Sequence, residues 1–189
     1  MSSFRRSLAA LILVASPAVA QTQSGMPAPT LPPTPNAGEM APDFTAQVTD
    51  STGKVWPVSL SGNLKGKVVV LAFYPLDRSC GCSIELSKFR DEYTTLFGDA
   101  VVLPVSIDTL ASHTSWAKDA HFPFAMIADP KSEVATKYGS QGTNPARPYF
   151  RRTTFVIGKD GKIVYADPRF NVNSQDAYDK LAAAVKAAK

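Results

Sequence analysis

The sequence predicts an α/β fold, with a central mixed sheet and helices on both of its faces. Residues 67–73 form a short β-branched run without polar alternation, which is typical of a strand buried on both sides. Strand patterns and helix patterns then alternate along the chain. A hairpin pattern and a last helix complete the order, and together these features favour one sheet packed between helices.

The first three strands are predicted at 44–48, 55–58 and 67–73. Lys65-Gly66 introduces the third of these runs. Pro75 ends it, because proline has no backbone N–H to donate to a sheet.

An amphipathic helix is predicted next, at 83–97. Its apolar residues recur at three- and four-residue spacing, at Leu86, Phe89, Tyr93, Leu96 and Phe97. We expect its first turn to begin at or just after Cys82, and Gly98 to end it.

The second half of the chain continues the alternation. Strands are expected at 100–107, 125–128, 153–158 and 162–166, and helices at 110–120, 131–138 and 174–188. Asp160-Gly161 is a strong hairpin signal between the last two strands.

The first 20 residues have the pattern of a secretory signal peptide. Arg5 and Arg6 precede an apolar run at 8–15, and Ala18-Val19-Ala20 has the small-x-small form of a signal-peptidase site. A buried helix or a membrane anchor is the alternative, but the run is well short of the ~20 residues that span a bilayer. We therefore expect an exported protein, periplasmic or secreted, with both the general and the twin-arginine routes open.

Residues 21–37 predict an extended, disordered linker, and 38–189 predict one globular domain. The linker contains five prolines among Thr, Ser and Gly, so it buries too little apolar surface to offset the entropy of ordering. A proline-rich docking motif is the less favoured interpretation. The whole chain is 44% hydrophobic and 19% charged, which suits a single domain with a sizeable core.

The charge of the chain does not indicate a surface that binds nucleic acid. Removal of residues 1–20 takes away two of the 20 basic residues and none of the 16 acidic ones, so the formal charge falls from +4 to +2. No cluster of Lys and Arg is interleaved with stacking aromatic residues. We expect neither a nucleic-acid partner nor, after removal of the signal, a membrane partner.

Both cysteines of the chain, Cys80 and Cys82, lie where the buried strand passes into the helix. A helix start has free backbone N–H groups and a partial positive charge, which favour the thiolate over the thiol. The thiolate is the nucleophilic form of cysteine. We interpret Cys82 as a reactive thiol. The alternative is that the two cysteines form a small structural disulfide or are two inert buried thiols.

The stretch around Cys82 resembles the active-site segment of peroxiredoxins. Pro75, Ser79 and Cys82 fit the family pattern P-x-x-x-[TS]-x-x-C. Phe73-Tyr74-Pro75, together with Gly81 and Glu85, is most similar to the bacterioferritin-comigratory branch.

The resemblance extends over residues 38–189. The segments that match in the expected order are the opening Gly38-Glu39-Met40-Ala41-Pro42-Asp43-Phe44, then Val105-Ser106-Ile107-Asp108, Ala128-Asp129-Pro130, and Arg152-Thr153-Thr154-Phe155. The resemblance implies a thioredoxin-like fold and a thiol-dependent peroxidase. Its substrate would be hydrogen peroxide or an organic hydroperoxide, and an external thiol, either a thioredoxin-like protein or a small thiol, would reduce the enzyme again.

The resemblance also implies roles for the site residues. Cys82 would be the nucleophile, and the hydroxyl of Ser79 would bond both thiolate and peroxide, a role compatible with capping the helix. Arg152 matches the family arginine, and Arg151 is the neighbouring alternative, because only one of the two can face the site. Pro75 would shape the pocket and limit solvent. Glu85 either holds the arginine by an ion pair or is a favourable charge at the helix start.

The chain departs from the family at Arg78, where an aromatic residue is usual, and at Cys80, where proline or another non-thiol residue is expected. A sulfenic acid on Cys82 must be resolved by another thiol. We favour Cys80 slightly as that thiol, although a disulfide between residues two apart would be strained and easily reduced. A one-cysteine mechanism is the alternative.

Two other classes of function are weighed against the peroxidase. An exported thiol-disulfide oxidoreductase would use Cys80-Gly81-Cys82 as a dithiol on protein substrates, but it lacks the usual C-x-x-C spacing. A non-enzymatic thioredoxin-like module would bind a metal or a partner. We expect no metal and no cofactor, and we interpret His113 and His121 as structural or surface residues.

Overall fold

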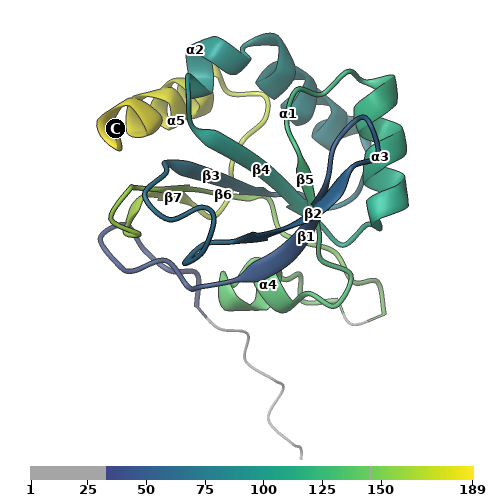
Figure 1. Cartoon of the computed structure of the whole chain (residues 1–189), viewed down its shortest axis with the longest axis horizontal. Coiled ribbons are helices and arrows are strands. Elements are labelled where there is room, and N and C mark those ends of the chain that lie inside the picture. Colours follow the sequence, from purple (N-terminus) through teal and green to yellow (C-terminus); the bar gives the residue numbers. More distant parts are fainter. Residues whose placement is uncertain (1–32, 145) are drawn as a thin grey trace, which may run out of the picture. The chain divides into compact units, whose positions relative to one another are not determined.

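The computed structural model describes residues 33–144 and 146–189, and these residues form one seven-stranded mixed sheet in the order β2-β1-β5-β4-β3-β6-β7 (Figure 1). The strands are β1 (Thr45–Thr49), β2 (Val55–Ser59), β3 (Val69–Phe73), β4 (Val101–Ser106), β5 (Met126–Ala128), β6 (Thr153–Ile157) and β7 (Ile163–Asp167). The helices are α1 (Cys80–Asp91), α2 (Tyr93–Phe97), α3 (Leu110–Asp119), α4 (Glu133–Lys137) and α5 (Gln175–Ala187).

The three central strands β3, β4 and β5 run parallel, and the outer strands are antiparallel to their neighbours. The carboxyl ends of β3, β4 and β5 therefore lie at one edge of the sheet. Antiparallel pairing of β3 with β6 places Thr153, the first residue of β6, opposite Phe73, the last residue of β3. The segment that precedes β6 thus meets the loop that follows β3.

All five residues of β3 are buried, because each face of the sheet has its own core. Val70 and Ala72 belong to one cluster, which includes residues of α1, α2, α3 and α5. Val69, Leu71 and Phe73 belong to the other, together with residues of α4 and of the β1–β2 hairpin. The run of consecutive β-branched residues is thus explained by packing on both sides.

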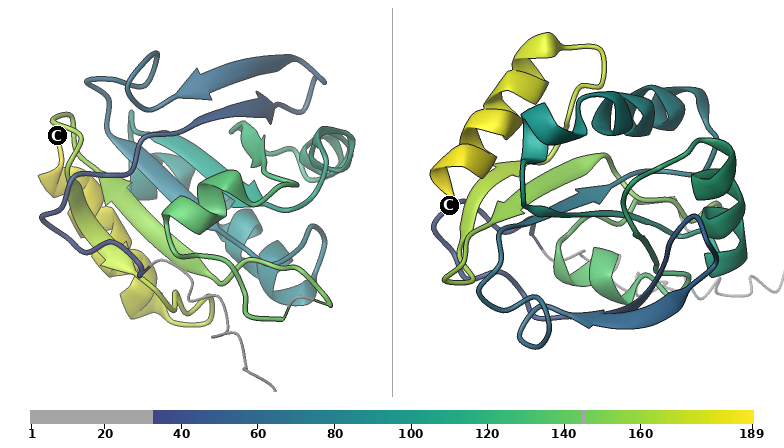
Figure 2. Two further views of the ribbon diagram at one scale, coloured as in Figure 1. Left: turned by 90° about the horizontal axis from the view of Figure 1, so that it is seen from below. Right: turned by 45° about the horizontal axis from the view of Figure 1, so that its top comes forward.

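Figures 1 and 2 show the same two layers, with α5 next to α2 on one side of the sheet and α4 on the other. This arrangement confirms the expected mixed sheet with helices on both faces. All predicted strands and helices are present to within two residues at each end, except around α1 and α2.

The predicted single helix at 83–97 is wrong in its start and in its continuity. Helix α1 begins at Cys80, because Ser79 has extended backbone angles and its carbonyl accepts the first helical hydrogen bond, from Ser83 N at 2.8 Å. The helical angles are interrupted at Glu92, with φ −109° and ψ 21°, and the chain resumes as the short α2. The hairpin signal at Asp160-Gly161 is confirmed, since Gly161 has φ +82° in the turn before β7.

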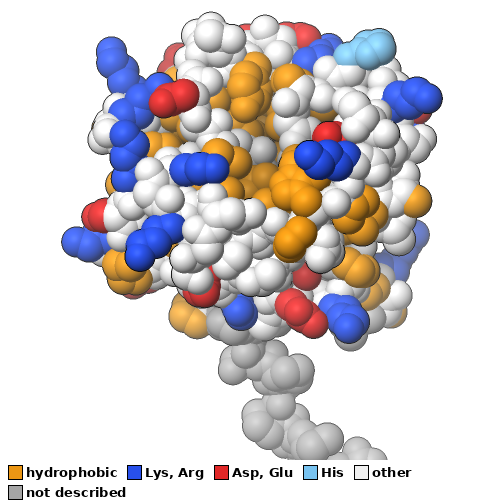
Figure 3. All heavy atoms as spheres, viewed as in Figure 1, with side chains coloured by type: hydrophobic (Ala, Val, Ile, Leu, Met, Phe, Trp, Pro, Cys, Tyr) orange, Lys and Arg blue, Asp and Glu red, His pale blue; other side chains and the backbone are white. Residues whose placement is uncertain are grey.

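The β5 strand is so short that it pairs with β4 only at Val105 and Ser106. The first residues of β4 have no strand partner on the side of β5. A cavity of about 400 Å³ lies beside these residues, and its lining includes Trp56, Tyr93 and Phe124. Apolar atoms gather near the middle of the face shown in Figure 3, with Lys and Arg side chains spread around them. The cavity lies at the amino end of β4, away from the edge at which β3 ends.

The expected signal peptide and residues 21–32 of the expected linker lie outside the described residues. Residues 33–36 belong to no helix or strand. None of the helices within 33–144 and 146–189 is long and apolar enough to cross a membrane.

Candidate active site

The two cysteines lie at the carboxyl edge of the parallel strands, where β3 passes through residues 74–79 into α1. Cys80 is the first residue of the helix and Cys82 the third, so the backbone N–H of Cys82 is among the four that have no partner within the helix. Cys82 is fully buried, whereas Cys80 is exposed, and both thiols are free.

Two side chains donate hydrogen bonds to the sulfur of Cys82. The hydroxyl of Ser79 lies 2.8 Å from Sγ, and Nη2 of Arg152 lies 3.3 Å from the same atom. The sulfur thus accepts two hydrogen bonds, and one of them comes from a positively charged guanidinium. Ser79 is the N-cap by position, but its side chain accepts no backbone hydrogen bond, and its hydroxyl is directed at the sulfur instead.

Arg152 reaches the site because it immediately precedes β6, opposite the end of β3. Its Nη1 forms an ion pair with Oε2 of Glu85, whose side chain is completely buried one turn along α1 from Cys82. Arg151 turns the other way and donates to the carbonyl of Gly139 and to Thr34 Oγ1. The alternation of side chains along an extended chain thus separates the two arginines.

Burial raises the pKa of Glu85 to about 7, although the charge and the hydrogen bond of Arg152 oppose that rise. Burial alone would lower the pKa of Arg152, but Glu85 and the Cys82 sulfur together raise it above its ordinary value. Within the described residues, Oε1 of Glu85 is a buried oxygen without a hydrogen-bond partner. The guanidinium is therefore shared between a carboxylate and a sulfur.

Gly81 makes room for the guanidinium. A Cβ atom at this position would lie 3.1 Å from Nη2 of Arg152, so a side chain there would displace the arginine. Pro75 is half-buried and follows Tyr74, whose backbone N–H donates to Val105 O at 3.0 Å beside the end of β3.

Cys80 and Cys82 are not bonded to each other. An α-helix turns by about 100° per residue, so side chains two positions apart point about 200° away from each other. Cys80 is directed to solvent from the first position of α1, and Cys82 is directed into the core.

Asp77, which the sequence analysis did not select, is buried beside the site. It bonds to His113 of α3, which lies 36 residues away and is fully buried. No local spacing links these two residues, and only the parallel neighbours β3 and β4 bring their following loops together. His121, by contrast, is exposed after the end of α3. The described residues hold no group of three or more His, Cys, Asp or Glu side chains suited to a metal ion.

The chain is similar to known proteins over most of the domain. Residues 37–166 match the model of the AhpC/TSA family. A putative peroxiredoxin bcp of Coxiella burnetii is 34% identical over 145 residues, which cover 74% of this chain and 93% of that protein. The chloroplastic peroxiredoxin Q of Triticum aestivum is 38% identical over 133 residues, which cover 68% of this chain but only 57% of the wheat protein's length.

A solved structure gives the same result. The crystal structure of peroxidoxin BcpB from Mycobacterium tuberculosis superposes with a TM-score of 0.69 at 28% identity, and the match covers 82% of this chain and 98% of the mycobacterial one. The chain therefore belongs to the AhpC/TSA family, as a peroxiredoxin of the Bcp and peroxiredoxin Q branch with a thioredoxin-like fold.

Proposed function

We propose that this protein is a thiol-dependent peroxidase that reduces hydrogen peroxide or small organic hydroperoxides through Cys82. The observation that carries the proposal is the pair of donors on its sulfur, Ser79 at 2.8 Å and Arg152 at 3.3 Å. Membership of the peroxiredoxins supports it.

The chemistry needs a thiolate and a stabilised leaving group. The thiolate attacks one oxygen of the peroxide, so that a sulfur–oxygen bond forms and the oxygen–oxygen bond breaks. The departing oxygen carries the negative charge and takes up a proton to become water or an alcohol. Ser79 and Arg152 are the donors that would stabilise this charge, as donors in an oxyanion hole do. Cys82 is left as a sulfenic acid.

The sulfenic acid is then condensed with a thiol, which releases water and forms a disulfide. Cys80 is the proposed resolving thiol of this chain. Because the two side chains point in different directions from α1, the bond requires the first turn of the helix to open. An external thiol, from a thioredoxin-like protein or a small molecule, would then reduce the disulfide.

The alternative of a thiol-disulfide oxidoreductase is less well supported. Such an enzyme needs a thiolate that a protein disulfide can approach, but Cys82 is fully buried. The exposed thiol, Cys80, has neither Ser79 nor Arg152 among its hydrogen-bond donors.

The experiment is to measure consumption of hydrogen peroxide by the mature chain in the presence of dithiothreitol, with a Cys82→Ser variant beside it. We expect Cys82→Ser to abolish the consumption and Cys80→Ser to retain the first turnover. Reduction of insulin disulfides in the absence of peroxide, together with no peroxide consumption, would favour the oxidoreductase instead.

We also propose that the protein is exported and cleaved after Ala20. The support is the pattern of residues 1–20, with two arginines, an apolar run and Ala18-Val19-Ala20. Expression of the full chain in a Gram-negative host should give a periplasmic form that begins at Gln21, as determined by intact mass. A cytoplasmic protein that keeps residues 1–20 would contradict this.

A further inference from the structure

We propose that Asp77 and His113 are positioning residues, which fix residues 77–79 so that the Ser79 hydroxyl lies against the sulfur of Cys82. The inference rests on the proposed function, since it concerns the reactivity of that sulfur. It assigns a role to a buried Asp–His pair outside the group of side chains that touch Cys82.

The carboxylate of Asp77 is held by donors from three side chains. Tyr74 donates to Oδ1 at 2.6 Å, Ser112 donates to Oδ2 at 2.6 Å, and Nδ1 of His113 lies 2.9 Å from Oδ2. Only 4% of the Asp77 side chain is exposed and none of the His113 side chain. Such a set of bonds fixes both the position and the orientation of the carboxylate.

His113 is bonded on both ring nitrogens. Nδ1 faces the Asp77 carboxylate, and Nε2 lies 3.1 Å from the carbonyl of Ile127 in β5. The ring is therefore held from both sides, between a carboxylate on the loop after β3 and a backbone carbonyl of β5. Asp77 and His113 thus form a buried hydrogen-bonded pair, in which removal of one side chain leaves a buried polar group of the other without its partner.

The pKa of Asp77 agrees with an ionised carboxylate. Burial is the largest single effect on it and would raise the pKa. The hydrogen bond and charge of His113, followed by the hydrogen bonds from Ser112 and Tyr74, outweigh burial and lower the pKa below its ordinary value.

The anchor matters because the next residue has an unfavourable backbone. Arg78 has φ +60°, in the left-handed region, which costs a residue with a Cβ atom roughly 1–2 kcal/mol. Its guanidinium donates to Asp119 at 2.6 Å and to Ser115 at 3.0 Å, but these groups are largely solvent-exposed, and such pairs stabilise little. The buried contacts of Asp77, together with its N–H bond to Asp108 at 2.8 Å, must hold the loop.

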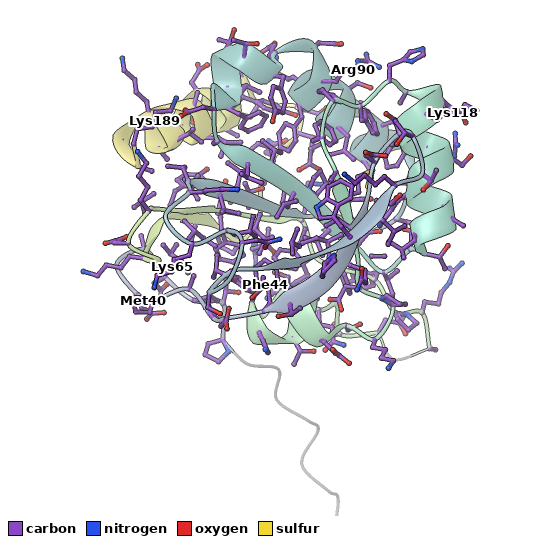
Figure 4. All side chains as sticks on the ribbon, viewed as in Figure 1. Met40, Phe44, Lys65, Arg90, Lys118 and Lys189 are labelled. Carbon is purple, nitrogen blue, oxygen red and sulfur yellow. The ribbon has the colours of Figure 1, made fainter. Side chains whose placement is uncertain are left out.

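Residues 77–79 connect the fixed carboxylate of Asp77 to the hydroxyl that contacts the sulfur. Ser79 follows two residues after Asp77, and its hydroxyl is one of the two donors on the sulfur. Ser112 and His113 both lie on α3, so α3 fixes the loop from outside the segment that contains the cysteines. Arg90 of α1 also reaches the end of α3, where it donates to Ala120 O at 2.8 Å (Figure 4). The proposal predicts that a change in α3 alters the reactivity of Cys82 without touching it.

The test compares His113→Leu with His113→Asn, each in a Cys80→Ser chain so that Cys82 is the only thiol. The measurements are the pH midpoint of the thiolate's ultraviolet absorbance and the single-turnover rate with hydrogen peroxide. We expect His113→Leu to move the midpoint to higher pH and to slow the reaction on the order of 10²-fold. His113→Asn keeps a donor toward Asp77, so its pH midpoint and its single-turnover rate should both lie close to those of the Cys80→Ser chain.

Two controls separate positioning from loss of stability. Val185→Ala removes buried atoms from α5, in the same core but away from the loop, and should lower the melting temperature while leaving the midpoint and the rate unchanged. In a Ser79→Ala chain, His113→Leu should have no further effect on the midpoint, because it acts through Ser79. If His113→Leu does not fold, Ser112→Ala removes one donor from Asp77 and should move both readouts in the same direction by a smaller amount.

A lowered melting temperature with an unchanged midpoint and rate would overturn the proposal. So would an equal effect of His113→Leu with and without Ser79. If the parent chain does not react with peroxide at all, the proposed function fails, but the midpoint still reports whether Asp77 and His113 position Ser79.

Discussion

At the scale of single residues, the sulfur of Cys82 is held between donors of two kinds. The Ser79 hydroxyl comes from the same helix start, and the Arg152 guanidinium comes from the residue before β6, 70 positions away in the sequence. Glu85 holds the guanidinium from its other side. Each of these side chains therefore influences the sulfur either directly or through one neighbour.

The two adjacent arginines give a matched pair of variants. We predict that Arg152→Lys lowers the single-turnover rate with peroxide on the order of 10²-fold, because an ammonium group cannot serve Glu85 and the sulfur with separate nitrogens. Arg151→Lys should leave the rate almost unchanged, since Arg151 contacts Gly139 and Thr34 instead. Stopped-flow mixing with hydrogen peroxide checks both, and equal losses in the two variants would contradict the assignment of Arg152.

The buried carboxylate of Glu85 predicts a pH dependence of stability. Burial raises the pKa of Glu85 to about 7 from an ordinary value of 4.5. Between these values the folded protein holds a proton that the unfolded chain has released, so this residue makes the free energy of unfolding fall as the pH rises from about 4.5 to about 7.

Glu85→Gln lacks this titration. The variant and the parent chain can also differ in free energy of unfolding by an amount that does not depend on pH. Beyond that, we predict that the free energy of unfolding of the variant rises relative to the parent by as much as about 3 kcal/mol between pH about 4.5 and about 8. Urea unfolding at the two pH values measures this change. A difference that does not vary with pH would mean that Glu85 titrates like an exposed carboxylate.

At the scale of elements, α1 delivers the site because it begins at Cys80, and its first turn contains Gly81 next to the guanidinium. Periodicity of apolar residues predicted a later start, because Cys80 and Gly81 contribute nothing to an apolar stripe. The N-cap preference of Ser79 was the available signal, and it indicates the observed start.

Gly81 gives a prediction in which stability and activity change in opposite directions. Gly81→Ala should stabilise α1 by up to about 1 kcal/mol through helix propensity. The same Cβ atom would lie 3.1 Å from Arg152 Nη2, so the arginine must shift and the rate with peroxide should fall. Thermal unfolding and single-turnover kinetics on the same sample test both parts, and an unchanged rate would show that the guanidinium position is not critical.

Part of the site could be predicted from the sequence, and part could not. Cys82 and Ser79 were selected from the motif pattern and Arg152 from its match to the family arginine, and the structure brings the three together. The resemblance favoured Arg152 over the alternative Arg151, and in the structure Arg152 contacts the sulfur while Arg151 contacts Gly139 and Thr34. Asp77 and His113 were not paired, because a contact between residues 36 positions apart depends on which strands are neighbours.

At the scale of the whole molecule, the two cores hold the strand that positions the site. Leu71 is the middle residue of β3 and is fully buried. We predict that Leu71→Ala lowers the free energy of unfolding by about 2–5 kcal/mol. Val164→Ala, at an exposed position of β7, should change it by less than about 0.5 kcal/mol. Urea denaturation checks both, and similar small losses would contradict the two-sided packing of β3.

The fold as a whole was the most predictable level. Runs of buried strand, helical periodicity and the Asp160-Gly161 turn are local patterns, and the elements they indicate are present in the described residues, except that the single helix expected at 83–97 is divided into α1 and α2. The order of the strands in the sheet is not local, and it is this order that places residues 77–79, α3 and Arg152 at one edge.

The most direct measurement is the intact mass of the reduced mature chain after one equivalent of hydrogen peroxide, beside Cys82→Ser and Cys80→Ser. We predict that the parent chain rapidly loses two hydrogen atoms as the Cys80–Cys82 disulfide forms, and that Cys80→Ser gains one oxygen atom on Cys82. Cys82→Ser should not react on this timescale. A parent chain whose mass does not change within minutes would contradict a peroxidatic role for Cys82.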